Sequence, residues 1–532
     1  MAKKMVKKTV HVAGPKTASK LQRQHFLRPV KLAMFTVMLV QSPFGSAAEW
    51  RIVPTATLRE TYSDNANNAT RGNEQSDFIT DISPGVQITG TGRRLRLNAD
   101  YSMHNLLYAN GTQGSSIVNQ LNANGFAELV DDLVFLDASA SVSRQSISAF
   151  GPQSDNLYSN TNATNVRTVS LSPFTRYRFG NQATSEVRFA HTATSTGQAG
   201  LSNSQTDSLS ATLDSGTAFN TVGWGVHANK SNTHYTETQS QQSQNEGANL
   251  RYRLNNQLSL TATGGYESYS YAVTDGEKPE GKYWSTGFIW APTERTHVDA
   301  SFGRRYYGNS YALNASNRSR YVTTTLVYSE DITTSQEQFA QQTSTSTATL
   351  FDTLFQASVP DATLRSQAVA AFIRNNGLPE SFASSVNSLT NRIFLQKRAQ
   401  LSTAFTASKT TVVASAYTTT REAQSGAQAD ASLLSANSFA LDADNRVTGV
   451  SLFGTVRVSP VSTANLGTSL ARTTSLNSDR RDTNKNVTLG LSTQFQPKLR
   501  GTVELRRNQT DSNLTGGSTR ENAISAYLSM QL

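Results

Sequence analysis

The feature that most constrains this chain is a strict alternation of apolar and polar residues, in stretches of about ten that recur to the end of the sequence. In residues 94–104, the apolar residues at odd positions, from Leu95 to Met103, share one face, and every residue between them is polar. In an amphipathic helix, apolar residues recur instead at spacings of three and four. The alternation therefore predicts β-strands with one apolar and one polar face.

Such stretches are found near residues 51–62, 78–89, 94–105, 119–129, 133–143, 166–179, 183–192, 207–214, 219–228, 248–254, 258–269, 282–290, 296–306, 310–316, 320–329, 398–407, 411–420, 446–458, 463–471, 486–495, 499–508 and 521–532. The count is about 22 strands, with a range of 18 to 24, because boundaries taken from a pattern are soft by several residues.

The connections alternate between short and long. The short ones carry turn-forming residues, for example Gly90-Thr91-Gly92, Ala291-Pro292 and Ser459-Pro460. The long ones are polar and include residues 63–77, 145–165, 229–245 and 421–445. Outer-membrane barrels have short periplasmic turns and longer outer loops. The pattern thus predicts an all-β protein, a transmembrane antiparallel β-barrel of the bacterial outer membrane. A soluble β-helix would show a fixed coil period, which is absent here.

Residues 1–48 have the composition of a signal peptide. They hold nine basic residues and no acid, and they include an apolar stretch of nine residues at 32–40, interrupted only by Thr36, and small residues at 46–48. Nine residues are too few to span a bilayer as a helix. We predict a signal peptide over residues 1–48 and an outer-membrane barrel over residues 49–532. An uncleaved anchor or a misassigned start codon is the alternative.

The net charge of the whole chain is +10, but this excess lies in the predicted signal peptide. Removing its nine basic residues leaves 39 basic against 38 acidic residues. The basic character therefore supports no interaction with nucleic acid.

Residues 345–392 interrupt the alternation. Their apolar residues recur at spacings of three and four, at Leu350, Phe351, Leu354, Phe355, Leu364, Ala368, Ala371 and Phe372. This spacing predicts two short amphipathic helices within a long loop. Such an insert is either a decorated surface loop or a lid or constriction that folds into the lumen.

Residues able to carry chemistry are few and scattered. The absence of cysteine excludes disulfides, thiolate catalysis and thiolate zinc sites. The histidines after the signal peptide, His104, His191, His227, His234 and His297, form no paired ligand motif and are interpreted as lumen or loop residues. We expect no catalytic site, no cofactor and no metal. A hydrolase assembled from distant Ser, His and Asp residues stays an alternative, which convergence of such side chains in the lumen would favour.

Arginines dominate the polar faces of the predicted strands. Opposite the apolar faces lie Arg51, Arg59, Arg94, Arg96, Arg176, Arg178, Arg188, Arg251, Arg253, Arg305, Arg457 and Arg506, against the acids Asp100, Glu186, Asp299 and Glu504. A lumen lined by arginine favours anions. We assign a candidate anion path to Arg94, Arg96, Arg176, Arg178, Arg188, Arg251, Arg253 and Arg305. In the alternative, these arginines pair with loop acids or with lipopolysaccharide phosphates. The segment 304–307, Arg-Arg-Tyr-Tyr, is interpreted as an interfacial girdle, with a sugar-facing patch as the alternative.

An ordered set of short motifs runs along the chain, at residues 52–54 (IVP), 59–65 (RETYSDN), 92–97 (GRRLRL), 290–296 (WAPTERT), 304–311 (RRYYGNSY) and 317–320 (NRSR). Together they resemble the PEP-CTERM system-associated outer-membrane proteins, a family of bacteria with exosortase and exopolysaccharide gene sets. The resemblance implies an outer-membrane barrel linked to exopolysaccharide production or export, and it carries over no catalytic residue.

The expected function is a non-enzymatic pore or assembly component for export of an anionic exopolysaccharide. The expected partners are outer-membrane lipid, lipopolysaccharide, the polysaccharide and other export components. The alternative is a structural or surface-display barrel that anchors sorted proteins or polysaccharide.

Overall fold

The computed structural model describes residues 48–152, 158, 162–271, 279–340, 351, 352, 355, 365, 368, 369, 372, 389–430 and 444–532. The chain divides into two units, Met1–Ala48 and Glu49–Leu532. The predicted signal peptide lies outside the described residues except for Ala48.

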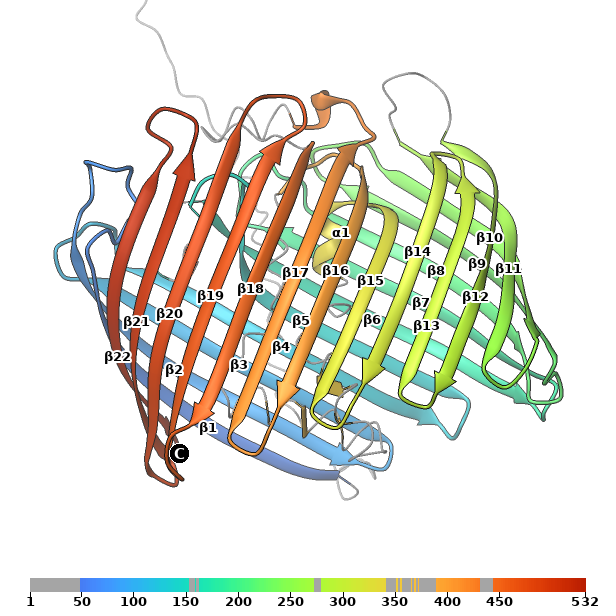
Figure 1. The fold of residues 1–532 in the computed structure, drawn as a ribbon, viewed down its shortest axis with the longest axis horizontal. Coiled ribbons are helices and arrows are strands. Elements are labelled where there is room, and N and C mark those ends of the chain that lie inside the picture. The colour runs from blue at the N-terminus through green and yellow to red at the C-terminus, as the bar shows by residue number, and fades with distance from the viewer. Residues whose placement is uncertain are drawn as a thin grey trace, which may run out of the picture. The chain divides into compact units, whose positions relative to one another are not determined.

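The second unit is a sheet of 22 antiparallel strands, each paired with its neighbours in the sequence (Figure 1). The strands are β1 (Ala48–Ser63), β2 (Asp77–Gly92), β3 (Leu95–Tyr108), β4 (Ser116–Val130), β5 (Val134–Ser146), β6 (Ala163–Phe179), β7 (Ala183–Thr196), β8 (Ser204–Ser215), β9 (Val222–Tyr235), β10 (Gln241–Arg253), β11 (Leu258–Ser270), β12 (Glu280–Thr293), β13 (Thr296–Arg305), β14 (Gly308–Arg318), β15 (Val322–Thr333), β16 (Phe394–Thr406), β17 (Thr410–Ala423), β18 (Asn445–Arg457), β19 (Ser462–Ser475), β20 (Arg481–Gln496), β21 (Leu499–Ser512) and β22 (Thr519–Gln531). β1 pairs with β22, so the sheet closes into a barrel. The predicted fold class and strand number are confirmed.

The outward face of the barrel is apolar. On β20, Val487, Leu489 and Leu491 are 44% to 50% exposed, and the residues that alternate with them face the lumen. Exposed apolar residues of this kind recur around the barrel from β1 to β22, with inward polar residues between them. An apolar surface of this extent requires hydrocarbon around it, and closure leaves no unpaired strand edge in the lipid. The chain is an outer-membrane β-barrel.

The two ends of the barrel differ. At one end, here the short-turn end, the connections run from two residues (93–94) to six (216–221). At the other, the long-loop end, they include residues 64–76, 147–162, 334–393 and 424–444. In outer-membrane barrels the longer loops face the cell exterior. The short-turn end therefore faces the periplasm.

Three predicted connections were wrong. Gly90-Thr91-Gly92 lies within β2 and Ala291-Pro292 lies within β12, while β9 and β10 cover most of residues 229–245 and leave a loop of 236–240. The strands are longer than the pattern suggested because antiparallel pairing continues beyond the apolar belt, where alternation fades. Two prolines inside strands mark interruptions of this pairing. Pro84 lies at a gap in the β2–β3 register and Pro292 at a bulge between β12 and β13, since proline has no N–H to donate.

Helices are short among the described residues. α1 (Ser335–Ala340) directly follows β15, and η1 (Ala427–Asp430) is a 3-10 turn between β17 and β18. The sequence pattern missed α1. The described residues of the insert between 351 and 372 are helical, and the bounds of the two predicted helices lie outside the described residues. No described helix is long and apolar enough to cross a membrane.

A charge on the outward face tests this arrangement. Leu97 on β3 is one outward residue that could be tested, but it lies near the short-turn end. Leu489 gives a stricter test, because it pairs with Leu466 and Leu505 in the middle of the apolar belt. Leu489→Arg should destabilise the barrel by roughly 2–4 kcal/mol, because it places a charge in the hydrocarbon. Heat-modifiable migration in the outer-membrane fraction measures assembly.

The matched control is Thr488→Arg, one residue away on the lumen side, which should assemble normally. Equal assembly of both variants would contradict the facing of β20.

Candidate functional site in the barrel lumen

The eight arginines of the predicted anion path fall into two groups. Four of them form ion pairs: Arg94 with Asp131, Arg176 with Glu186 (2.7 Å), Arg188 with Asp137 (2.6 Å), and Arg305 with Glu267. Arg94 lies in the turn before β3 and not within the strand. Of the four partner acids, sequence parity had identified only Glu186. Cross-strand partners depend on the register between strands, which alternation within one strand does not reveal.

The other four, Arg96, Arg178, Arg251 and Arg253, are exposed and form no ion pair with any described residue. We call them the rim arginines. They lie on β3, β6 and β10, all at the short-turn end. Gly223 leaves room for Arg251, whose guanidinium lies 3.2–3.3 Å from where a Cβ would stand. These four side chains place positive charge at the periplasmic mouth.

Three inward phenylalanines form a row beside the rim arginines. The rings of Phe126, Phe135 and Phe174 are stacked, with centroids 5.9 Å and 5.0 Å apart. The guanidinium of Arg188 lies 3.8 Å from the centre of the Phe174 ring, and that of Arg96 lies 5.9 Å from the Phe126 ring. These stacking and cation–π contacts stiffen the wall and hold the arginine side chains in place. Because they cover the faces of the rings, little aromatic surface is left on which a sugar ring could stack.

The segment 304–307 is not an interfacial girdle. Arg304 points outward, whereas Arg305 points inward to the fully buried Glu267. Tyr306 and Tyr307 form the hairpin between β13 and β14 and pack around this ion pair. The tyrosines therefore shield a buried ion pair at the long-loop end.

Between β15 and β16 the described residues are 334–340, 351, 352, 355, 365, 368, 369, 372 and 389–393, and we call these residues the closing segment. It leaves β15 on the near wall, and α1 contacts β6 and β7 on the far wall (Figure 1). There, Phe339 of α1 and Leu389 pack with Ile147, Val166 and Leu201 in one buried cluster.

Asn391 joins the closing segment to two loops at the long-loop end. Its amide nitrogen donates to the carbonyl oxygens of Gly200 (2.9 Å) and Ala429 (3.1 Å), and its oxygen accepts from the N–H of Ser202 (2.8 Å). The hydroxyl of Thr390 and the N–H of Asn391 both donate to Asp430, at 2.7 Å. Burial raises the pKa of the Asp430 carboxyl, and these two hydrogen bonds oppose that shift. We call Thr390, Asn391 and their hydrogen-bond partners the joint. It connects loops from opposite walls of the barrel.

The closing segment also reaches the short-turn end. Phe351 and Val369 are buried against Ala404 of β16 and Val413 of β17, both close to the turn at 407–409. Phe355, Phe372 and Phe453 pack around this cluster. Because the described residues of the insert contact the inner wall at this depth, the packing favours the lid or constriction over the surface loop.

One lumen cluster has the composition of a catalytic triad. His104 Nδ1 lies 2.9 Å from Asp81 Oδ2, and His104 Nε2 lies 3.2 Å from Ser102 Oγ. Ser83 Oγ donates to Asp81 (2.5 Å) and also lies 2.9 Å from His104 Nδ1. Sequence analysis found no such grouping, because Asp81 and Ser102 meet only through the β2–β3 pairing.

The cluster lacks one part of a hydrolase. Ser102 is paired with Gly85 of β2 and Gln120 of β4, so its N–H belongs to the ladder and does not point at a developing oxyanion. The hydroxyl of Ser83 also competes with Asp81 for the Nδ1 atom of His104. Interrupted pairing at Pro84 explains why polar side chains gather here.

The remaining histidines are dispersed. His227 lies in the lumen and bonds Tyr283 (2.9 Å), whereas His191 points outward and bonds Asp207 (2.7 Å). Among the described residues, no group of three or more metal-binding side chains is placed to hold an ion.

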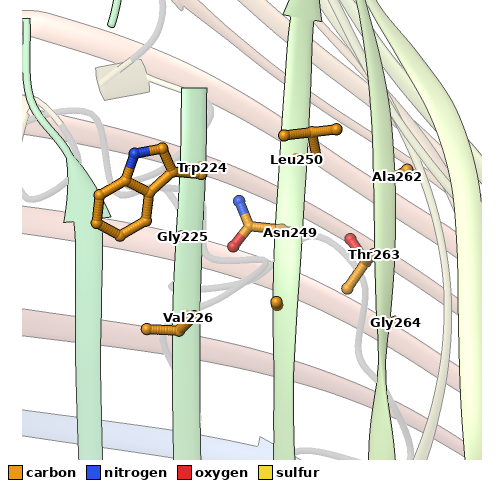
Figure 2. Close-up of a pocket in the computed structure, with 9 residues that line it drawn as sticks. Trp224, Gly225, Val226, Asn249, Leu250, Ala262, Thr263 and Gly264 are labelled. Atoms are coloured by element: carbon orange, nitrogen blue, oxygen red, sulfur yellow. The ribbon is translucent and has the colours of Figure 1, made fainter. Parts of the chain in front are cut away.

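A groove of about 540 Å³ lies on the membrane-facing side of β9–β11 (Figure 2). Trp224, Val226 and Leu250 flank it, and the small residues Ala248, Ala262 and Gly264 leave the hollow between them. Its apolar, hydrocarbon-facing position separates it from the lumen.

No family model and no curated protein matches the chain. Solved structures of similar architecture include the siderophore receptor PirA from Acinetobacter baumannii, at 6% identity and a TM-score of 0.47, covering 91% of this chain and 80% of that one. The ferric-catecholate import receptor Fiu from E. coli K12 has 7% identity and a TM-score of 0.46, with coverage of 91% and 82%. OpdO from Pseudomonas aeruginosa has 10% identity and a TM-score of 0.31, with coverage of 90% and 97%. Similarity at this level implies no shared substrate.

Proposed function

We propose that the protein is a gated, non-enzymatic conduit of the outer membrane for an anionic polymer. Following the family resemblance, we propose that this polymer is an exopolysaccharide on its way out of the cell. The observation that carries the proposal is the position of the rim arginines. They stand at the periplasmic mouth, where an exported polyanion would enter, and no described acid forms an ion pair with them.

The charge of the rim suits transport. Exposed guanidinium groups attract anions, and each contact stays weak because water and salt screen it. Conduction needs binding strong enough for entry and weak enough for release. The paired arginines deeper in the wall, Arg188 and Arg305, add little net charge and so would not trap the polymer.

The closing segment supports gating. It contacts both ends of the lumen, and its joint to the loops consists of hydrogen bonds and one small apolar cluster. A plug made from a loop of the chain can shift without leaving the barrel. The same inward packing also favours the alternative of a structural barrel that anchors surface material and passes nothing.

Charge neutralisation at the rim tests the anion preference. Replacing Arg96, Arg178, Arg251 and Arg253 by Gln should lower anion selectivity several-fold in planar bilayers, because it removes this positive charge. The control replaces the exposed, outward-facing Arg167, Lys230, Lys282 and Arg304 by Gln, an equal change of charge outside the lumen. Equal selectivity in both variants, or cation preference in the native barrel, would favour the structural alternative.

Loosening the joint tests gating. Asn391→Ala removes three hydrogen bonds between the closing segment and the loops, so open events should become at least several-fold more frequent in single-channel recordings. Asn513→Ala, which removes an amide bonded to Asp479 at the same end, is the matched control and should leave opening unchanged. A barrel that stays silent after Asn391→Ala and after deletion of residues 345–388 would contradict a conduit.

The Asp81–His104–Ser102 cluster permits a direct test of the enzyme alternative. We expect Ser102 to resist a fluorophosphonate probe, because its own N–H belongs to the strand ladder and is not free to stabilise an oxyanion. Mass spectrometry of the labelled, folded barrel measures this. Labelling that is lost in Ser102→Ala and His104→Gln but kept in Ser83→Ala would instead identify a nucleophile.

A further inference from the structure

Outward-facing cations gather on one side of the barrel at the long-loop end. They are Arg446 on β18, Arg472 on β19, Arg481 and Lys485 on β20, Arg507 on β21 and Arg520 on β22. All six are exposed, and we call them the outer basic patch. They share the parity of the exposed apolar residues on the same strands, and no register shift intervenes between the belt and the patch.

The patch begins where the apolar belt ends. Along the outward face, Leu470 is followed by Arg472, Val487 by Lys485, and Leu505 by Arg507. Two residues of a strand span about 6.6 Å, so these cations stand one step above the last apolar side chain. With the long loops outside the cell, that level is the headgroup layer of the outer leaflet.

Neighbouring strands bring the cations together. Leu470 pairs with Lys485, and Val487 pairs with Arg507, so successive strands carry a cation at nearly the same height. Strands lie about 4.8 Å apart, and one anion can therefore meet cations from two strands. Polar outward residues such as Thr483, Gln509 and Asn522 lie between them and supply further hydrogen-bonding groups.

Little negative charge opposes the patch. Asp511 bonds Lys485 (3.1 Å) and Arg71 (2.9 Å), but the five arginines of the patch form no ion pair with any described residue. Elsewhere at the same level the outward charges are mixed. On β9–β13, Lys230, Lys282 and Arg304 alternate with Glu246 and Glu280. The excess of positive charge is thus confined to β18–β22.

We infer that the outer basic patch binds the phosphate groups of lipid A in the outer leaflet. Arginine binds phosphate through two parallel N–H···O bonds, and a phosphate group can carry two negative charges where a carboxylate carries one and a neutral sugar none. The acyl chains of the same molecule then lie against the apolar belt below. This contact fixes a glycolipid to one side of the barrel, and it does not depend on what the lumen conducts.

The experiment measures lipid A bound to the purified, folded barrel by native mass spectrometry. Three forms are compared: the native protein, the triple variant Arg472→Gln, Arg507→Gln and Arg520→Gln, and the control Lys230→Gln, Lys282→Gln and Arg304→Gln. Bisphosphorylated lipid A should bind the patch variant at least fivefold more weakly, while the control keeps native binding. Heat-modifiable migration establishes that each form is folded.

Two further probes identify the ligand. Dephosphorylated lipid A should bind all three forms weakly, and inorganic phosphate should compete only at far higher concentration than lipid A, because it lacks acyl chains. Equal lipid A binding by the patch and control variants would overturn the inference. So would equal binding of phosphorylated and dephosphorylated lipid, or competition by free phosphate at the concentration of the lipid.

Discussion

The pairing of β1 with β22 is the constraint on which the rest of the structure depends. In hydrocarbon an unpaired N–H or C=O group costs several kcal/mol, so a sheet with free edges is not viable there. Residues 55–63 pair with 523–531 in an unbroken register and remove both edges. Closure also separates two environments, a surface that meets lipid and a lumen that meets water. The alternation in the sequence follows from this separation, because successive residues of a strand face lipid and water in turn.

The sequence was sufficient to predict the barrel, because each strand carries its own two-faced pattern. An outward residue within the belt is apolar whatever its partner on the next strand, as Val487 on β20 and Leu505 on β21 illustrate. The inward arginines followed from the same parity. What parity cannot provide is register, so the pairing of Arg188 with Asp137 was not predictable. The meeting of Asp81 with His104 depends on register in the same way.

The closing segment shows a second limit of sequence reasoning. Helical spacing around Phe351 and Phe372 predicted an amphipathic insert, but an apolar face does not indicate which surface will cover it. The structure covers it with Ala404 and Val413, two small inward residues whose strands otherwise present polar side chains to the lumen. Similarly, α1 escaped notice because six residues are too few to show a period.

The joint at Asn391 sets the ratio between two populations of the barrel, one with the closing segment attached to the far wall and one with it released. Four of the hydrogen bonds between described residues join the closing segment to loops of the far wall: Asn391 donates to Gly200 and accepts from Ser202, Leu389 donates to Ile147, and Gln336 donates to Ser202. At about 0.5–1.5 kcal/mol each, they amount to about 2–6 kcal/mol. By these bonds alone, the released form would account for between roughly one molecule in thirty and one in twenty-five thousand. The buried contacts of Phe339 and Leu389 reduce that fraction further. Under the gating proposed above, nearly all copies would be shut, and a ligand would reverse the ratio only if it favoured the released form by more than this difference.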